Sequence, residues 1–224
     1  NMTIWILLIV VTLIITLAVL VYKHDNTEFA RLTGYSLFDI VLNAKKSHLH
    51  KLMTQLDKVS GEHKVLIDLH LPVNNTNYPV DAILIHESGV YVIDGVKKTG
   101  WISGNEEQTE WVELKHKEKQ EMFPNPITVN KHIVLALREL LPEVNPDAYV
   151  AISLFSDACS FQKIEIHSQN VEVMKRNELK LWTKQIGGEV LSKEEIHTIY
   201  KALEGYMSFK QQLTKEASKQ PVTS

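Results

Sequence analysis

A run of 19 residues without a charged side chain, from Ile4 to Tyr22, constrains this chain more than any other feature. It reads IWILLIVVTLIITLAVLVY and has two threonines as its only polar interruptions. At about 1.5 Å per residue, a helix of this length is close to the thickness of the hydrocarbon layer of a bilayer. Trp5 and Tyr22 stand near its ends, where aromatic rings favour the lipid–water interface. The run therefore predicts a transmembrane helix within residues 1–23.

We expect this helix to be a retained anchor in the cell membrane rather than a cleaved signal peptide. No basic residue precedes the run, and no small-residue cleavage pattern follows it. Lys23 and Arg31 come after the run, so the positive-inside rule predicts a single-pass protein whose C-terminal domain is cytoplasmic. Residues 24–35 are polar and are expected to form a juxtamembrane linker.

The remaining composition narrows the possible classes of function. The formal net charge is −3, which argues against a protein that coats nucleic acid by bulk charge but leaves room for a local basic patch. The single cysteine, Cys159, excludes an internal disulfide framework and a cysteine-based zinc cage. His48 and His50 are two residues apart on an expected helix, where side chains do not converge, so no zinc site is expected there.

Hydrophobic periodicity predicts one mixed α/β domain over residues 36–210, followed by a tail over 211–224. Ser192 to Glu195 forms a capping box, which indicates the start of a late helix. A turn or short strand is expected over 100–104. The expected helices cover 36–58, 125–141, 177–186 and a segment beginning near 192, and the expected strands cover 63–71, 81–86, 90–96, 109–114, 149–155, 163–166 and 171–174.

Four stretches of the sequence carry a family resemblance. They are HKVLIDLHLP (63–72), VDAILIHESGVYVIDGVKKTGWISG (80–104), the strand around Trp111, and FPNPITVNKHIVLALREL (123–140). Together they resemble the nuclease-related domain, or NERD, family, and the resemblance covers most of residues 36–205. It implies a restriction-endonuclease-like fold of the PD-(D/E)XK type, with a central mixed sheet flanked by helices. Membrane-tethered members exist, which agrees with the predicted anchor.

The resemblance also implies a chemistry. Enzymes of this fold cut phosphodiester bonds with Mg²⁺ or Mn²⁺ held by two carboxylates, because these cations prefer oxygen ligands. Asp81 matches the first acidic position, and Asp94 matches the second, where the family usually has glutamate. With Ser88-Gly89 as a hairpin loop, Asp81 pairs with Val96, and the two aspartates are diagonal neighbours on one face. They are the candidate metal ligands and catalytic carboxylates, and no other cofactor is expected.

The lysine that this chemistry needs is not at its expected position. A lysine two residues after the second carboxylate would orient or deprotonate the attacking water. Val96 stands there instead. Lys97, the remaining candidate for a catalytic lysine, points to the opposite face of a regular strand. Only a β-bulge at Gly95 would rotate Lys97 toward the carboxylates.

Two more polar positions implied by the resemblance differ in this chain. A lysine pair, Lys45-Lys46, stands near the place of an expected glutamate in the first helix. Val129, followed by Asn130, stands where a glutamine is expected after Asn125-Pro126. Of the four polar positions, only the two aspartates are kept in some form.

Basic residues after the strands are candidate contacts for nucleic-acid phosphates. Lys97 and Lys98 follow the second strand of the hairpin, and Lys115 and Lys117 belong to a basic cluster that neighbouring glutamates dilute. The alternative interpretation is an ordinary solvated turn in the first case and a charged hairpin tip in the second.

Three functions follow as hypotheses. The first is a membrane-anchored domain that keeps the nuclease fold, has lost most of its catalytic groups, and binds nucleic acid, with DNA as a candidate, or a membrane or cytoplasmic protein partner. The second is an active metal-dependent DNA nuclease that uses Asp81 and Asp94, with Lys97 brought round by the bulge. The third is a purely structural assembly protein.

Overall fold

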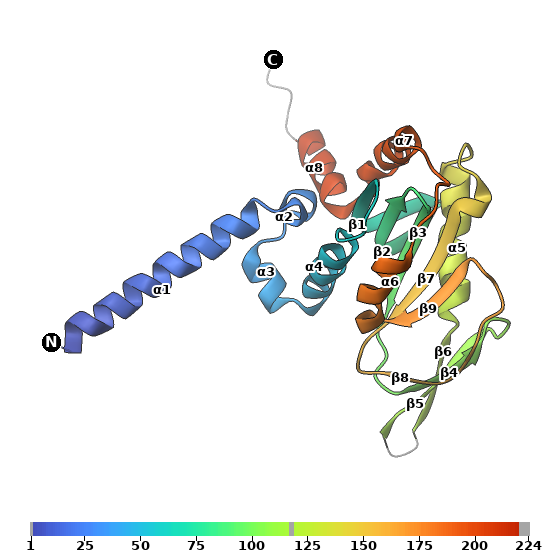
Figure 1. The fold of residues 1–224 in the computed structure, drawn as a ribbon, viewed down its shortest axis with the longest axis horizontal. Helices are drawn as coiled ribbons and strands as arrows, with labels where there is room; N and C mark the ends of the chain where they lie inside the picture. Colours follow the sequence, from blue (N-terminus) through green and yellow to red (C-terminus); the bar gives the residue numbers. More distant parts are fainter. Residues whose placement is uncertain (1, 117–118, 220–224) are drawn as a thin grey trace.

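The apolar N-terminal run forms α1 (Met2–Asp25), a helix that extends away from the rest of the molecule (Figure 1). In the computed structural model, which describes residues 2–116 and 119–219, α1 is long and apolar enough to cross a membrane. Its side chains are largely exposed until His24, which is buried. The Nε2–H group of His24 donates to the carbonyl oxygen of Tyr35 at 2.8 Å, because a carbonyl can only accept. The end of α1 is therefore packed against the domain.

Three helices follow α1: α2 (Glu28–Thr33), α3 (Leu37–Leu42) and α4 (Ala44–Leu56). Helix α2 lies within the predicted linker and buries Phe29 and Leu32 in the main hydrophobic core. The single helix expected over 36–58 is divided into α3 and α4. Asn43 ends α3, and its side chain caps α4 by accepting a hydrogen bond from the backbone N–H of Lys46.

The central sheet is mixed and has the strand order β1-β2-β3-β7-β9. The pairs β1–β2 and β2–β3 are antiparallel, whereas β3–β7 and β7–β9 are parallel. Strands β3 and β7 are apolar and almost continuously buried, as expected for central strands covered on both faces. The bounds are β1 (His63–Val73), β2 (Thr76–His86), β3 (Gly89–Val96), β7 (Tyr149–Phe155) and β9 (Val171–Lys175).

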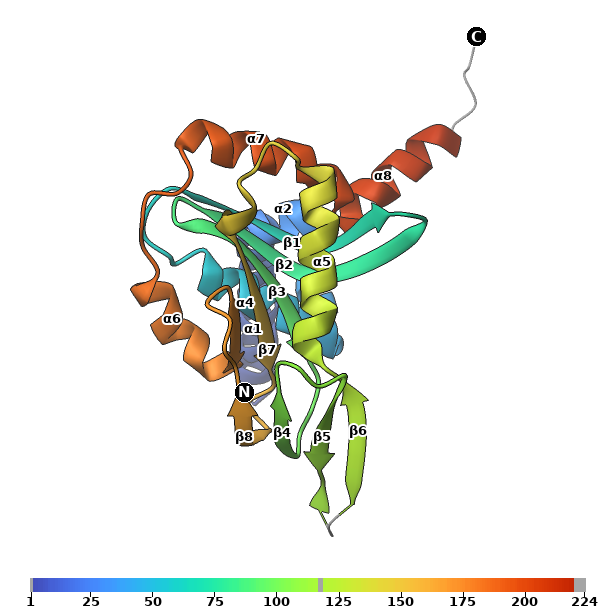
Figure 2. The same ribbon diagram turned by 90° about the vertical axis from the view of Figure 1, so that its right-hand side faces the viewer.

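Helices cover both faces of this sheet (Figures 1 and 2). Helix α5 (Pro126–Leu140) packs on one face, and α4 and α6 (Leu179–Gln185) lie on the other. Asn125 caps α5 and Pro126 occupies its first turn, as the Asn-Pro sequence predicts. The C-terminal helices are α7 (Lys193–Leu203), which starts at the predicted capping box, and α8 (Ser208–Lys219), which extends into the predicted tail. Single 3-10 turns, η2 (Pro146–Ala148), η3 (Arg176–Glu178) and η4 (Glu204–Tyr206), join these elements.

A second, smaller sheet lies beyond the N-terminal end of α5 (Figure 2). Its strand order is β6-β5-β4-β8, and its bounds are β4 (Trp101–Asn105), β5 (Glu110–Leu114), β6 (Gln120–Pro124) and β8 (Ser160–Glu165). Trp111 and Phe123 form a second hydrophobic cluster with Phe155 of the central sheet. The sequence did not predict β6 or a separate sheet. The predicted fold class, an N-terminal apolar helix followed by a mixed α/β domain with helices around the sheets, is confirmed.

Candidate functional site

The β2–β3 hairpin brings the two candidate carboxylates together, in a register that differs from the predicted one. The loop is Glu87-Ser88, and Gly89 pairs with His86. The predicted loop at Ser88-Gly89 is therefore wrong by one residue, which shifts the pairing of the two strands by two residues. Gly89 has φ +150°, and a Cβ atom there would lie 2.7 Å from the carbonyl oxygen of Ala148, so this turn position requires glycine.

The shift by two residues preserves which side chains share a face. Ala82 pairs with Ile93, and the same register continued by one residue places Asp81 opposite Asp94 rather than diagonal to it. Burial and the neighbouring Asp81 carboxylate raise the pKa of Asp94 to about 7. The Gly95 N–H and Lys45 lower this pKa, but by less. Asp94 is therefore partly protonated near neutral pH.

Asp81 is held by a chain of hydrogen bonds that begins at Arg176. The guanidinium Nη1 of Arg176 lies 3.2 Å from Nδ1 of His48, and Nε2 of His48 lies 3.1 Å from Oδ2 of Asp81. A guanidinium only donates, so Nδ1 accepts and the ring proton sits on Nε2, from which it is donated to Asp81. The backbone N–H of Gly95 donates to the same oxygen at 3.1 Å.

A third aspartate lies in the same row across the sheet. Asp68 of β1 stands between the pairs Ile67–Ala82 and Leu69–Val80, at the level of Asp81. Its φ of +53° interrupts the strand, and its Oδ2 accepts a hydrogen bond from the Tyr35 hydroxyl at 2.6 Å. Lys45 of α4 lies 3.9 Å from its Oδ1. Lys45 is thus the cation between Asp68 and Asp94, and it comes from a helix.

The position of the missing lysine is filled by Val96. β3 pairs regularly with β7 through Val96, so the bulge at Gly95 that was considered for Lys97 does not form. The strand ends at Val96, and the N–H of Lys98 donates to the Val96 carbonyl at 3.1 Å, which makes a tight turn at Lys97. Lys97 lines the same pocket as Asp81 because of this turn. Within the described residues it forms no ion pair with Asp81 or Asp94.

Asp81, His48, Lys97 and Arg176 border a pocket with a volume of about 280 Å³. It lies between the first turn of α4, the carboxyl ends of the parallel strands β3 and β7, and the turn after β9. In open α/β sheets, ligands bind beyond the carboxyl ends of parallel strands. The lining residues are Ala44, His48, Asp81, Gly95, Val96, Lys97, Leu154, Phe155, Ser156 and Arg176.

The divalent cation implied by the family resemblance does not fit this arrangement well. Oδ2 of Asp81 already accepts hydrogen bonds from His48 and Gly95. Val96 supplies neither an oxygen ligand nor an ammonium group. Across residues 2–116 and 119–219, no group of three or more His, Cys, Asp or Glu side chains is arranged to hold a metal ion. Mg²⁺ can be held by one or two carboxylates with water completing its octahedron, so what counts against it here is the occupied Oδ2 of Asp81 and the partly protonated Asp94.

The other candidate lysines are placed differently. Lys98 forms an ion pair with the buried Glu113 at 3.1 Å and lies over the ring of Phe123. Glu113 also accepts hydrogen bonds from the N–H groups of Thr99 and Gly100, so Lys98 belongs to a structural cluster. Lys115 pairs with Glu121 at 2.6 Å. Lys117 lies outside the described residues. These lysines remain predicted nucleic-acid contacts.

Asn130, which follows the expected glutamine position, holds the sheet together instead of facing the pocket. It is buried, and its Nδ2 donates to the carbonyl oxygens of Val92 at 3.0 Å and Ile152 at 2.8 Å. The two carbonyls belong to β3 and β7. Asn130 therefore ties α5 to the two strands that end at the pocket.

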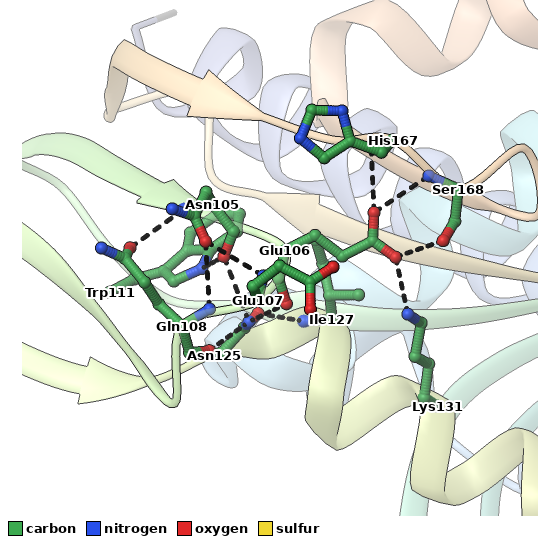
Figure 3. Close-up of polar contacts among 10 residues, drawn as sticks. All are labelled: Asn105, Glu106, Glu107, Gln108, Trp111, Asn125, Ile127, Lys131, His167 and Ser168. Carbon is green, nitrogen blue, oxygen red and sulfur yellow. Dashed lines mark hydrogen bonds and ion pairs between the residues drawn. The ribbon is translucent and has the colours of Figure 1, made fainter.

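A buried carboxylate, Glu106, organises the junction between the two sheets (Figure 3). It accepts hydrogen bonds from Lys131 Nζ at 2.6 Å, from the N–H groups of His167 and Ser168 at 2.9 Å, and from the Ser168 hydroxyl. Burial opposes ionisation, but these donors outweigh it and hold the pKa of Glu106 far below its usual range. All of its contacts are internal, so this cluster is a structural clamp.

Sequence reasoning missed two of the pocket residues. His48 was considered only as a zinc ligand with His50, although its place on α4 aims it at Asp81. Arg176 carries no local signal, because it follows β9 and is 128 positions away from His48. Only the fold brings the two together.

Comparison with known proteins identifies the central part of the chain. The family model described as nuclease-related domain, NERD, matches residues 44–156, about half of the chain. An uncharacterized protein of Bacillus anthracis is 27% identical over 121 residues, which are 54% of this chain and 56% of that relative. The chain thus spans just over half of the length of that relative. No solved structure matches the chain. The family match includes His48, Asp81 and Asp94, and it excludes α1 and Arg176.

Proposed function

Because the chain belongs to the nuclease-related domain family, we propose that it is a membrane-anchored member that binds nucleic acid without cutting it. In this proposal the fold and the two aspartates of a nuclease are kept, but the groups that would activate water are lost. The pocket binds a phosphodiester group through its cations.

The observation that carries this proposal is the replacement of the expected lysine by Val96 at the edge of the pocket. The Val96 side chain packs against the second hydrophobic cluster, and an apolar group neither accepts a proton nor stabilises negative charge. One oxygen of Asp81, Oδ2, already accepts a hydrogen bond from His48, so it is less available as a metal ligand. Both features favour binding over hydrolysis.

The charge of the pocket supports a phosphate ligand. Arg176 and Lys97 both line it, and Asp81 is the carboxylate among the lining residues; it accepts a hydrogen bond from His48. A guanidinium offers several donors in one plane, which suits a phosphate better than a carboxylate-rich pocket would. The Arg176 side chain is 32% exposed, so a ligand can reach it in competition with Asp157, whose Oδ2 lies 3.8 Å from Nε of Arg176.

The position of α1 supports a retained anchor with the domain on the cytoplasmic side. α1 continues past Tyr22 as a helix to Asp25, and its buried His24 connects it to the domain. Cleavage after the apolar run would break the continuous helix that joins the run to the packed His24. Lys23 and Arg31 follow the run and favour the cytoplasmic side. A reporter fused to the C-terminus that is active only in the cytoplasm tests the orientation.

Binding is tested with the full chain in lipid nanodiscs and labelled single-stranded and duplex DNA, at several salt concentrations. Arg176→Gln and Lys97→Gln are each expected to weaken binding and to reduce the salt dependence by about one released counterion. Lys201→Gln is the matched control, because Lys201 is an exposed lysine of α7, away from the pocket. Equal losses in all three variants, or no binding by the wild type, would leave the structural or protein-binding hypothesis.

Cleavage is tested with the same samples in Mg²⁺ or Mn²⁺. We expect no cation-dependent cutting above the level of the Asp81→Ala variant. Cutting that requires the cation and disappears in both Asp81→Ala and Asp94→Ala would establish the active nuclease instead.

A further inference from the structure

Helix α3 presents three large apolar side chains to the outside on one face. Phe38 is 53% exposed, Val41 74% and Leu42 83%. At about 100° per residue, these three positions fall within one stripe of the helix, and the buried Ile40 lies on the opposite side. Ser36 and Asp39 form a capping box that stabilises this short helix. The stripe is therefore a formed surface that points away from the core.

This stripe is next to the end of the membrane-spanning candidate helix. α1 and α3 contact each other, and Figure 1 shows α3 on the side of the domain from which α1 extends. The hydrogen bond from His24 to the Tyr35 carbonyl fixes the end of α1 just before α3 begins. If α1 crosses the bilayer, α3 is held close to the point where it emerges.

Resting on the proposed membrane anchorage, we propose that Phe38, Val41 and Leu42 insert into the lipid–water interface beside α1. Exposed aromatic and aliphatic side chains on a short polar-capped helix are suited to the boundary between headgroups and acyl chains. Continuity with α1 selects lipid as the occupant of this face, because any partner covering the stripe has to share the space at the emergence point with the bilayer.

This second contact would fix how the domain stands on the membrane. α4 begins at Ala44, immediately after Leu42 and Asn43, and its residues Ala44 and His48 line the pocket. An anchor of one helix alone allows the domain to rotate about it. Two contacts orient the pocket at a constant height above the headgroups, where it meets ligands that approach along the membrane.

The test uses the full chain in vesicles of phosphatidylcholine and phosphatidylglycerol, with single labels. Cys159, which is buried, is replaced in Cys159→Ala, and an environment-sensitive fluorophore is attached at Leu13→Cys, Val41→Cys or Lys163→Cys. All three positions are exposed, so the labels leave the core intact. Leu13 reports on the bilayer interior, Val41 on the stripe, and Lys163 on a strand of the smaller sheet. Nitroxide lipids that quench at shallow or deep positions measure the depth of each label.

We expect the label at Val41 to shift its emission to shorter wavelength and to lose emission to the shallow nitroxide, whereas the label at Lys163 does neither. Quenching at Leu13 with none at Val41 would overturn the interfacial contact and leave the anchor standing, with a protein partner as the occupant of the stripe. No quenching at Leu13 would overturn the anchorage and, with it, this inference. A label at Val41 that is quenched only by the deep nitroxide would also contradict an interfacial position.

Discussion

Replacing Asp94 with asparagine is expected to stabilise the protein above neutral pH and to change its stability much less at acid pH. Asp94 lies opposite Asp81 in the continued β2–β3 register, and burial and Asp81 raise the pKa of its carboxyl from 3.8 to about 7. Asparagine has nearly the same shape and cannot ionise. The variant therefore removes the cost of a buried like-charge pair while keeping the packing.

The sign and size of the effect follow from linkage. The folded state binds the Asp94 proton more tightly than the unfolded state, so the cost of ionisation is absent below the unfolded pKa of 3.8. It grows as pH rises between the two values and is complete above about 7. The difference between the two pKa values corresponds to about 4 kcal/mol in the free energy of unfolding, at about 1.4 kcal/mol per pKa unit. Between about pH 5 and about pH 8 the gain from Asp94→Asn should increase by about 2–3 kcal/mol.

The assay is chemical unfolding of the full chain in nanodiscs, followed by tryptophan fluorescence at about pH 5 and about pH 8. The matched control is Asp147→Asn, which changes an exposed aspartate of η2. The control is expected to be nearly neutral at both pH values. A loss of stability in Asp94→Asn at pH 8, or a gain of the same size at both pH values, would refute the carboxylate pair as described.

The same unfolding assay distinguishes a carboxyl pair that binds a divalent cation from one that does not. If a divalent cation bound between Asp81 and Asp94, Mg²⁺ or Mn²⁺ would stabilise the wild type at pH 8 and would not stabilise Asp94→Asn. We expect no such difference at millimolar cation, because Oδ2 of Asp81 already accepts hydrogen bonds from His48 and from the Gly95 N–H. This readout depends on stability and not on activity, so it is informative even without a known substrate.

Three further substitutions test other parts of the structure. Glu106→Gln loses the buried ion pair with Lys131 and should lower the free energy of unfolding by about 2 kcal/mol in the same unfolding assay. Gly95→Ala places a Cβ atom 2.5 Å from Oδ2 of Asp81, so we expect a loss of about 1–3 kcal/mol and a displaced carboxylate in a crystal structure. Val96→Lys adds an ammonium group at the edge of the pocket, and the pH-dependent cost expected for Asp94 should become smaller; an unchanged pH profile would show that position 96 does not reach the carboxyl pair.

The sequence predicts most of the fold because its signals are local. The apolar run before Tyr22 predicts α1, and the Asn125-Pro126 start predicts α5 to within one residue of its observed C-terminal end. The first long helix is divided at Asn43, whose side chain caps α4. The sequence indicates this division only through a weak apolar pattern, because a single capping side chain leaves little periodic signal. The smaller sheet was missed because it is built from short strands, and β6 carries too few apolar residues to be recognised alone.

The sequence predicted only the part of the site that the β2–β3 hairpin carries, namely Asp81 and Asp94. An error of two residues in the hairpin register leaves every side chain on its own face, so the adjacency of Asp81 and Asp94 survived a wrong loop. The place of Lys97 depends on a tight turn after the strand, which strand periodicity does not contain. Arg176 reaches the site only through the parallel pairing of β9 with β7.

The charges around the carboxyl pair come from different elements, and they offset only part of the repulsion between Asp81 and Asp94. Val96 supplies no ammonium group, so the end of β3 offers the two carboxylates no counter-charge of its own. A positive charge comes instead from α4, where Lys45 forms an ion pair with Asp68 and lowers the pKa of Asp94. Burial and the neighbouring Asp81 outweigh Lys45, because the pKa of Asp94 is still raised to about 7. The stability that we expect Asp94→Asn to gain above neutral pH is therefore the part of the cost that Lys45 leaves uncompensated.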